Sequence, residues 1–252
     1  VWARHYLECV YPRTNPRPEE INPELRLFAS QGEYEPCTFT IRPLKDLAGA
    51  RVRVTPIGPI SPKDVDVRHV RFMRARPNYT VVNRYRVVPD VLERFETLDL
   101  KAGENARFWI TVHVPEGTKP GTYTGKATFE CSAGAAEVPI RLRVLPIRLQ
   151  DDPSKLYGIY YRHPLDEAAQ AKDDVSREYF RRKAELEAAD MVAHGTRNVV
   201  LSAPVSASDA EGNFKADWDV LAAKMDLWRK MGFRGPIVMH IGSGVYYKYM
   251  KE

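Results

Sequence analysis

Apolar and polar residues alternate with a period of two through the first 150 residues. Residues 51–54 and 109–114 are two examples, with an apolar side chain at every second position. This alternation is typical of a strand that packs one face on a core and turns the other to water. Proline and glycine separate such segments, as at Gly58-Pro59. Many short strands divided by turns predict an antiparallel β-sandwich over residues 1–150.

The pattern changes near Asp152. Three later segments are apolar on both faces, which predicts strands covered on both sides: residues 156–161, 198–201 and 236–241. Two segments between them carry apolar residues at helical spacing: residues 175–194 and 217–231. Asp174 or Ser176 is expected to cap the first helix, and Gly195 to follow its end. Strand, helix and strand with short connections predict parallel pairing through right-handed crossovers.

Two parallel folds fit this second region, an open doubly wound sheet or a barrel. The turn after its first strand reads Tyr161-Arg162-His163-Pro164 and lacks a glycine-rich phosphate loop. We therefore predict a multidomain β plus α/β chain, with a sandwich at 1–150 and the first three β/α units of an incomplete TIM barrel at 151–252. A complete barrel takes about 250 residues, so we expect this chain to be a truncated fragment.

Net charge and the length of the apolar runs bear on whether nucleic acid or a membrane is a partner. The net charge is +5 and the pI is about 9.0, which raises the question of nucleic acid. However, Arg51 and Arg53 alternate with valines, as on the wet face of a strand, and no nucleic-acid motif accompanies them. We expect no nucleic-acid partner. No apolar run approaches the ~20 residues that cross a bilayer, so we expect no membrane span.

Cysteines and histidines suggest no metal site. Cys9, Cys37 and Cys131 are far apart, and free thiols are favoured although two of the three could pair. The six histidines show no metal-ligand spacing. We expect neither a metal nor another cofactor.

Several motifs resemble a known family. They are residues 27–36, 88–92, 102–105, 108–115, 119–125 and 157–161. Together they resemble bacterial glycoside hydrolases of family 123 and the similar domain of unknown function 4091 proteins, with an N-terminal β-sandwich and a TIM barrel. The resemblance spans nearly the whole chain and implies a carbohydrate substrate. It also suggests an extracellular or periplasmic location.

The resemblance implies a reaction as well. Family 123 enzymes cleave a terminal N-acetylhexosamine with an adjacent Asp-Glu pair late in the fourth barrel strand. The substrate's acetamido oxygen attacks, Asp orients it, and Glu is the general acid, an exception to the usual two-carboxylate scheme. The one Asp-Glu tandem here, Asp166-Glu167, follows the first strand and does not match. We therefore expect no catalytic residue in this chain, and place the catalytic carboxylates beyond residue 252.

Barrel sites lie at the carboxyl ends of the strands. The candidates there are Tyr161, Arg162 and His163 after the first strand, Ser202 after the second, and His240 with Gly242-Ser243-Gly244 after the third. We predict substrate binding by Arg162, Tyr161, His163 and His240.

Each role has a chemical reason and an alternative. The forked donors of Arg162 suit sugar hydroxyls, and the related family 20 hexosaminidases have an arginine in a similar place. A tyrosine could stack on a pyranose, and His240 could donate to a hydroxyl. Alternatively, Arg162 pairs with Asp166 or Glu167, and His240 is a core histidine.

Two other functions fit the same residues. The chain could be a non-catalytic glycan-binding or cell-surface module, or a nucleic-acid binder on the strength of its pI alone. The residues leave the sugar, the linkage and the oligomeric state open.

Overall fold

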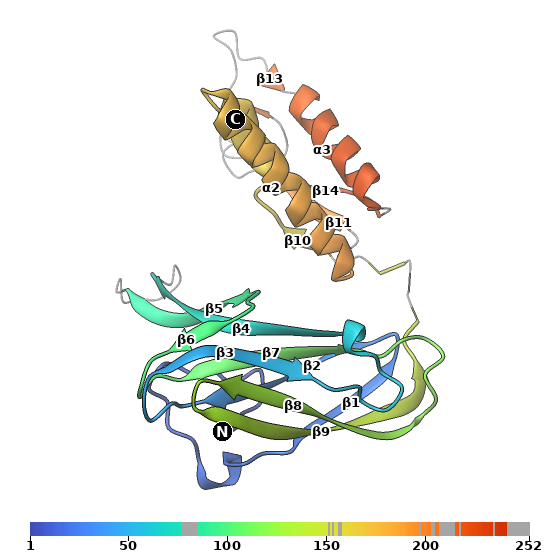
Figure 1. The fold of residues 1–252 in the computed structure, drawn as a ribbon. Coiled ribbons are helices and arrows are strands. Elements are labelled where there is room, and N and C mark those ends of the chain that lie inside the picture. Colours follow the sequence, from blue (N-terminus) through green and yellow to red (C-terminus); the bar gives the residue numbers. More distant parts are fainter. Residues whose placement is uncertain are drawn as a thin grey trace, which may run out of the picture. The chain divides into compact units, whose positions relative to one another are not determined.

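The chain folds as two compact units, Val1–Gln150 and Asp151–Glu252 (Figure 1). The computed structural model describes residues 1–76, 85–150, 152, 154–155, 158–196, 198–202, 205–206, 215–216, 218–233 and 235–240. The first unit consists of strands and two short 3-10 helices, η1 (Pro18–Glu20) and η2 (Pro62–Asp64). The second unit alternates strands with α-helices.

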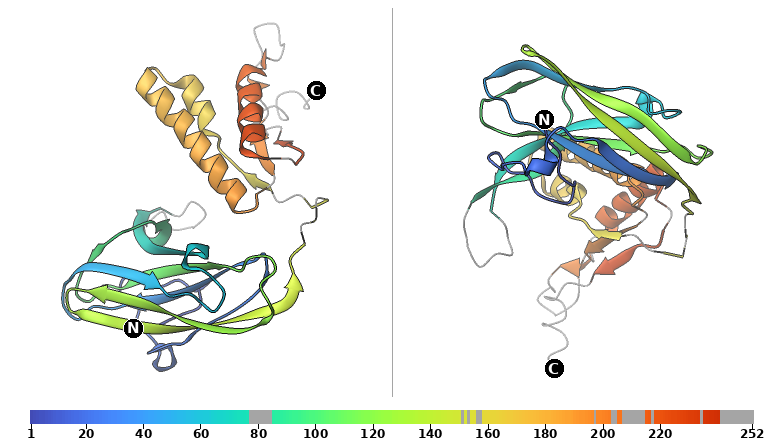
Figure 2. Two further views of the ribbon diagram at one scale, coloured as in Figure 1. Left: turned by 45° about the vertical axis from the view of Figure 1, so that its right-hand side comes forward. Right: turned by 90° about the horizontal axis from the view of Figure 1, so that it is seen from below.

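Two sheets lie face to face in the first unit (Figure 2). One has the order β1 (Leu25–Gln31), β9 (Gly134–Arg148), β8 (Gly121–Cys131), β3 (Leu47–Val54) and β6 (Leu98–Leu100). The other has the order β2 (Tyr34–Ile41), β7 (Ala106–His113), β4 (Val65–Ala75) and β5 (Arg86–Glu93). The predicted sandwich is present.

The sandwich core follows the alternation in the sequence. Ile140 and Leu142 of β9 are buried, whereas Arg141 between them is exposed. On the facing sheet, the ring of Phe108 lies 5.2 Å from that of Phe39, centroid to centroid. Inner-face side chains of the two sheets thus form one core, as expected for stacked sheets.

One strand departs from the predicted antiparallel pattern. β1 pairs with β9 in parallel, with Leu25 opposite Ile140 and Leu27 opposite Leu142. After β1, a turn at Gly32, whose φ of +82° favours glycine, carries the chain into β2 of the other sheet. The antiparallel prediction is wrong for this pair, because alternation identifies the buried face of a strand but not its partner.

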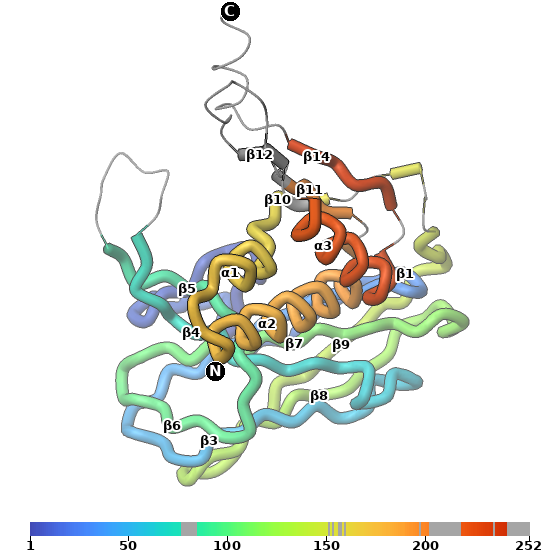
Figure 3. The backbone as a smooth tube through the Cα atoms, turned by 90° about the horizontal axis from the view of Figure 1, so that it is seen from above, coloured from blue at the N-terminus to red at the C-terminus, as the bar shows by residue number. Residues whose placement is uncertain are grey.

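The second unit contains three parallel strands in the order β10 (Gly158–Tyr160), β11 (Asn198–Ser202) and β14 (Val238–His240). Its helices are α1 (Pro164–Gln170), α2 (Asp174–Ala193) and α3 (Trp218–Met231). A short antiparallel pair joins β12 (Val205–Ser206) and β13 (Lys215–Ala216). The parallel pairing was predicted, whereas α1 was not. Helices α2 and α3 contact each other (Figure 3).

The start of α2 differs from the prediction. Asp173 is the N-cap, not Asp174 or Ser176: its Oδ1 accepts a hydrogen bond from the Ser176 N–H at 2.8 Å. Asp173 has the extended backbone that an N-cap requires, while Asp174 is already helical. The predicted end is correct, because Gly195 has a φ of +78° just past the helix.

The three-stranded sheet is covered on one face. Val199 and Leu201 are fully buried in a cluster with side chains of α2 and α3. On the opposite face Tyr160 is 79% exposed, and the edge strand β14 is exposed on both faces, with Val238 at 41% and Met239 at 42%. The prediction of strands buried on both faces is therefore wrong for β10 and β14 among the described residues.

Two further findings concern the whole described chain. None of its helices is long and apolar enough to span a membrane. All three cysteines are free thiols, as expected, but of the buried thiols expected from the sequence only Cys37 is buried.

Candidate functional site

A pocket of about 380 Å³ lies at the carboxyl ends of the parallel strands. Its lining residues are Tyr160, Tyr161, Arg162, Asp166, Val200, Leu201, Lys224 and His240. They come from β10 and the turn after it, α1, β11, α3 and β14. The pocket thus brings together three of the four residues predicted to bind substrate.

Arg162 is the most open of these residues. Its side chain is 88% exposed, and its Nε forms an ion pair with Glu167 Oε1 at 2.8 Å. Glu167 belongs to the first turn of α1, three positions after its first residue, Pro164. One of the predicted ion pairs therefore exists, yet it occupies one edge of the guanidinium and leaves further N–H donors free.

His240 lies beside Tyr160 at the pocket. The two rings meet edge to face, with centroids 6.2 Å apart. Both side chains are exposed, so His240 is not the core histidine of the alternative interpretation. Tyr160 was not selected from the sequence, although it is the last residue of β10, at the strand end where barrel sites lie.

Tyr161 is held by the neighbouring helix. Its hydroxyl donates to Glu187 Oε2 of α2 at 2.6 Å. Burial, followed by this bond to Glu187, raises the pKa of Tyr161, so the phenol stays neutral. Its side chain is partly buried and packs against the helix–sheet core. Tyr161 therefore shapes the pocket wall, while Tyr160 presents the more open ring.

His163 lies in the core and is absent from the residues that line the described pocket. Its Nδ1 accepts a hydrogen bond from the Leu165 N–H at 3.2 Å, which makes it the N-cap of α1. Its ring lies 5.2 Å from that of Trp228. Burial, then the nearby Lys224 charge, lowers the pKa of His163 to about 4, so it is neutral at pH 7.

Lys224 is the residue that sequence reasoning missed. It lies on the buried face of α3 with Leu221 and Trp228, and its side chain is 8% exposed. Its Nζ donates to Asp166 Oδ1 at 2.5 Å. The sequence carries a signal for this burial. Lys224 lies three residues after Leu221 and four residues before Trp228, so helical spacing places it on the same apolar face as these two core residues. Buried lysines need a partner, and Asp166 is that partner.

The pocket combines cations, one carboxylate and an open ring. Arg162 and Lys224 can donate to hydroxyl or amide oxygens, Asp166 can accept from hydroxyls, and Tyr160 can contact an apolar face. Asp166 is the one carboxylate among the described lining residues, and it is ion-paired. This chemistry suits the binding of a polar ligand better than acid–base catalysis.

Other candidate groups add little. The backbone of Ser202 pairs beside His240 at the strand ends, whereas Gly242-Ser243-Gly244 lies outside the described residues. Within the described part of the chain, no three His, Cys, Asp or Glu side chains are grouped as metal ligands.

Sequence comparison gives a family match. Residues 14–130 match the glycoside hydrolase 123 N-terminal domain, which covers most of the sandwich strands. No curated protein matches this chain.

Structural comparison adds a solved relative. A family 123 glycoside hydrolase from Clostridium perfringens, described for glycolipid glycan hydrolysis, matches with a TM-score of 0.69 and 15% identity. The match covers 86% of this chain but 44% of that enzyme, so this chain spans less than half of it. The Escherichia coli chaperone DraB also matches, at 12% identity over 52% of this chain and 56% of DraB, with a TM-score of only 0.29. The resemblance to family 123 glycoside hydrolases is thus confirmed, through their N-terminal domain over residues 14–130 and a shared fold over most of the chain.

Proposed function

We propose that this chain is the N-terminal part of a carbohydrate-active glycoside hydrolase that acts on terminal N-acetylhexosamine. In this proposal β10, β11 and β14 are the first strands of a TIM barrel, and the catalytic carboxylates lie beyond residue 252. The substrate's acetamido oxygen attacks the anomeric carbon and displaces the leaving group. One carboxylate orients the acetamide and a second protonates the departing oxygen.

The observation that carries the proposal is the pocket at the carboxyl ends of three parallel strands. In barrel enzymes this end of the strands holds the active site. Arg162, Lys224 and His240 reach it from three different strand–helix units. They would bind the sugar hydroxyls, while Tyr160 contacts a face of the ring.

The uncovered face of the sheet supports the barrel. Gly158, Tyr160, Val200 and Val238 share this face through the strand register. In a closed barrel the corresponding side chains fill the interior against other strands. The exposure of Tyr160 is what such a row shows when no further strand faces it.

A second candidate, a glycan-binding module without catalysis, is favoured by the state of the carboxylates. Asp166 is engaged by Lys224 and Glu167 by Arg162. A catalytic carboxylate has to reach the leaving group or the acetamide of the substrate, and both of these carboxylates are already held in ion pairs. We therefore expect residues 1–252 alone to bind a sugar without cleaving it.

An assay on aryl N-acetylhexosaminides separates the two candidates. Two proteins are compared: the full-length natural protein that contains residues 1–252, and its Arg162→Ala variant. Turnover that falls at least about tenfold in kcat/KM in the variant supports a hydrolase with this pocket as its subsite. Turnover that the variant leaves intact contradicts the site, and absence of turnover on every glycoside favours the binding module.

A further inference from the structure

We propose that a second pocket, on the sandwich unit, binds the pyranose ring of an uncharged sugar through Phe28 and Glu35. The pocket has a volume of about 560 Å³, within the range of small-molecule sites. It lies where residues 3–6 pass the edges of strands β1 and β2. This site is separate from the pocket at the strand ends and does not depend on the proposed hydrolase.

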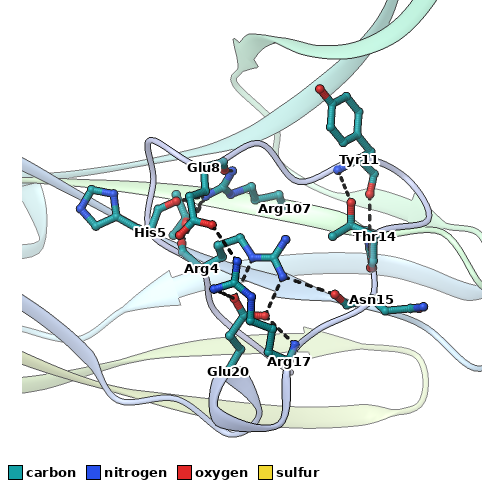
Figure 4. A network of polar contacts seen from close by, with 11 residues as sticks. Arg4, His5, Glu8, Tyr11, Thr14, Asn15, Arg17, Glu20 and Arg107 are labelled. Atoms are coloured by element: carbon teal, nitrogen blue, oxygen red, sulfur yellow. Dashed lines mark hydrogen bonds and ion pairs between the residues drawn. The ribbon is translucent and has the colours of Figure 1, made fainter.

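The rim of the pocket is already ordered (Figure 4). The guanidinium of Arg4 donates to both oxygens of Glu20, from Nε at 2.7 Å and from Nη2 at 2.8 Å. The backbone N–H of Arg17 donates to the same carboxylate at 2.7 Å. The bond from Arg4 lowers the pKa of Glu20, so the pair stays ionised. A ligand would meet a fixed wall and would lose little affinity in ordering it.

The N-terminal segment that forms one side of the pocket is fixed from behind. Arg107, only 3% exposed, donates to the carbonyl oxygens of Glu8 at 2.7 Å and His5 at 3.0 Å. The hydroxyl of Thr38 donates to the carbonyl oxygen of Arg4 at 2.8 Å. These bonds hold the segment on the sheet, so the pocket does not need the ligand in order to form.

Glu35 is the polar group that lacks a partner. It lies on β2, on the same strand face as the buried Cys37, and opposite Val112 of β7. Among the described residues, none makes a hydrogen bond or ion pair with its carboxylate. Burial, then the neighbouring charge of Glu33, raises the pKa of Glu35. Its oxygens are not among the buried atoms cut off from solvent, so they are free to accept hydrogen bonds from the hydroxyls of a sugar in the pocket.

Phe28 provides the apolar contact. It points outward from β1, is 65% exposed, and lines the pocket together with Tyr6. An exposed aromatic ring beside a hydroxyl acceptor is complementary to a pyranose, which has C–H groups on its faces and hydroxyls at its edges.

The charge of the lining selects an uncharged sugar over an anionic one. Four glutamates line the pocket, against two arginines. Both arginines are ion-paired, Arg4 with Glu20 and Arg26 with Glu24. An anionic sugar would therefore meet repulsion from Glu35 with no free guanidinium to offset it.

Amide-resolved NMR titration of residues 1–252 tests the site. The probes are methyl β-glycosides of glucose, galactose and their 2-acetamido analogues, with methyl glucuronide and butylamine for comparison. We expect shifts in the segments 3–6, 25–28 and 35–38 with an uncharged glycoside. Phe28→Ala and Glu35→Gln should each weaken this binding about tenfold or more. Matched controls are Leu44→Ala, at a residue 97% exposed outside the pocket, and Glu130→Gln on β8.

Each outcome decides the proposal. Weakening in both pocket variants with unchanged binding in both controls supports it. No shift with any glycoside, or shifts that both pocket variants retain, overturns it. Tighter binding of butylamine than of every sugar would overturn it as well, because Glu35 would then serve a cationic ligand. Shifts confined to the strand ends of the second unit would leave the proposed hydrolase intact and contradict this site alone.

Discussion

The sandwich and the β/α unit bury their sheets in different ways. In the sandwich, Phe39, Phe108 and Ile110 are 0% exposed, because two sheets cover each other. In the β/α unit, the helices cover one face of the sheet, and Tyr160 on the other face is 79% exposed. In the sandwich the inner faces of both sheets are thus buried against each other. In the described residues of the β/α unit, by contrast, one face of the sheet lacks a covering layer.

This difference separates stability from function. Exposed apolar surface contributes little to folding, so natural proteins that retain it commonly use it for contacts. In the β/α unit, Tyr160 of the exposed face lines the same pocket as Arg162 and His240. The least covered part of the sheet is also where the candidate ligand groups gather.

The largest expected effect is in the sandwich core. Phe108→Ala removes a ring that packs on Phe39 and Phe129, and should lower the free energy of unfolding of this unit by about 3–5 kcal/mol. Hydrogen exchange with mass spectrometry can follow each unit separately. The control Leu44→Ala, at an exposed position, should have almost no effect. Equal loss of protection in both units would show that they unfold together, which would contradict the view that each unit has its own core.

His163 should make the stability of the β/α unit depend on pH. Burial lowers the pKa of His163 to about 4, from the ordinary histidine value of 6.5. Between these two pH values the unfolded chain therefore binds a proton that the folded chain does not. Stability should therefore fall by roughly 3 kcal/mol as pH drops from 6.5 to 4, and this group should contribute no change above 6.5.

His163→Asn is the matched control for this effect. Asparagine can still accept from the Leu165 N–H as an N-cap, but it does not titrate. Chemical denaturation at several pH values should show a flatter profile for the variant. An unchanged slope would mean that other groups cause the pH dependence.

The ion pair of Lys224 gives a smaller, asymmetric effect. Asp166→Asn leaves a buried ammonium without its counter-charge and should destabilise the β/α unit by about 1–3 kcal/mol, less than for a fully buried pair because Asp166 is 44% exposed. Lys224→Met should cost less, since an apolar chain of similar length suits the helix stripe. Denaturant titration of both variants measures the asymmetry. A larger loss for Lys224→Met would show that the ammonium makes further stabilising contacts.

The smallest effect is expected at Tyr161. Tyr161→Phe removes the hydrogen bond to Glu187 but keeps the ring, so the loss should be about 1 kcal/mol. Thermal unfolding can detect it. A loss above that for Asp166→Asn would contradict the ranking and make the Tyr161–Glu187 bond the main link between β10 and α2.

Much of the fold could be predicted because it depends on local patterns. Alternation along β9 identified its buried face, and Gly195 identified the end of α2. The parallel pairing of β1 with β9 could not be predicted in this way, because it joins residues more than a hundred positions apart. The exposure of Tyr160 also escaped prediction: an apolar run resembles a strand covered on both sides even when one cover is missing.

The site was predicted in part for the same reason. The order of elements places Arg162 just after β10 and His240 at the end of β14, and both residues line the pocket. The burial of His163 and the pairing of Lys224 with Asp166 depend on how α1 and α3 pack, and α1 itself was not foreseen. A lysine within an apolar helical stripe is the one local sign that could have led to this pair.

The most direct test of the central claim is an NMR titration of residues 1–252 with N-acetylgalactosamine and N-acetylglucosamine, followed at the amides near Arg162, Lys224 and His240. Our account predicts saturable shifts at these positions that Arg162→Ala weakens. Saturating sugar that leaves all three positions unchanged would contradict the assignment of the strand-end pocket as a sugar subsite.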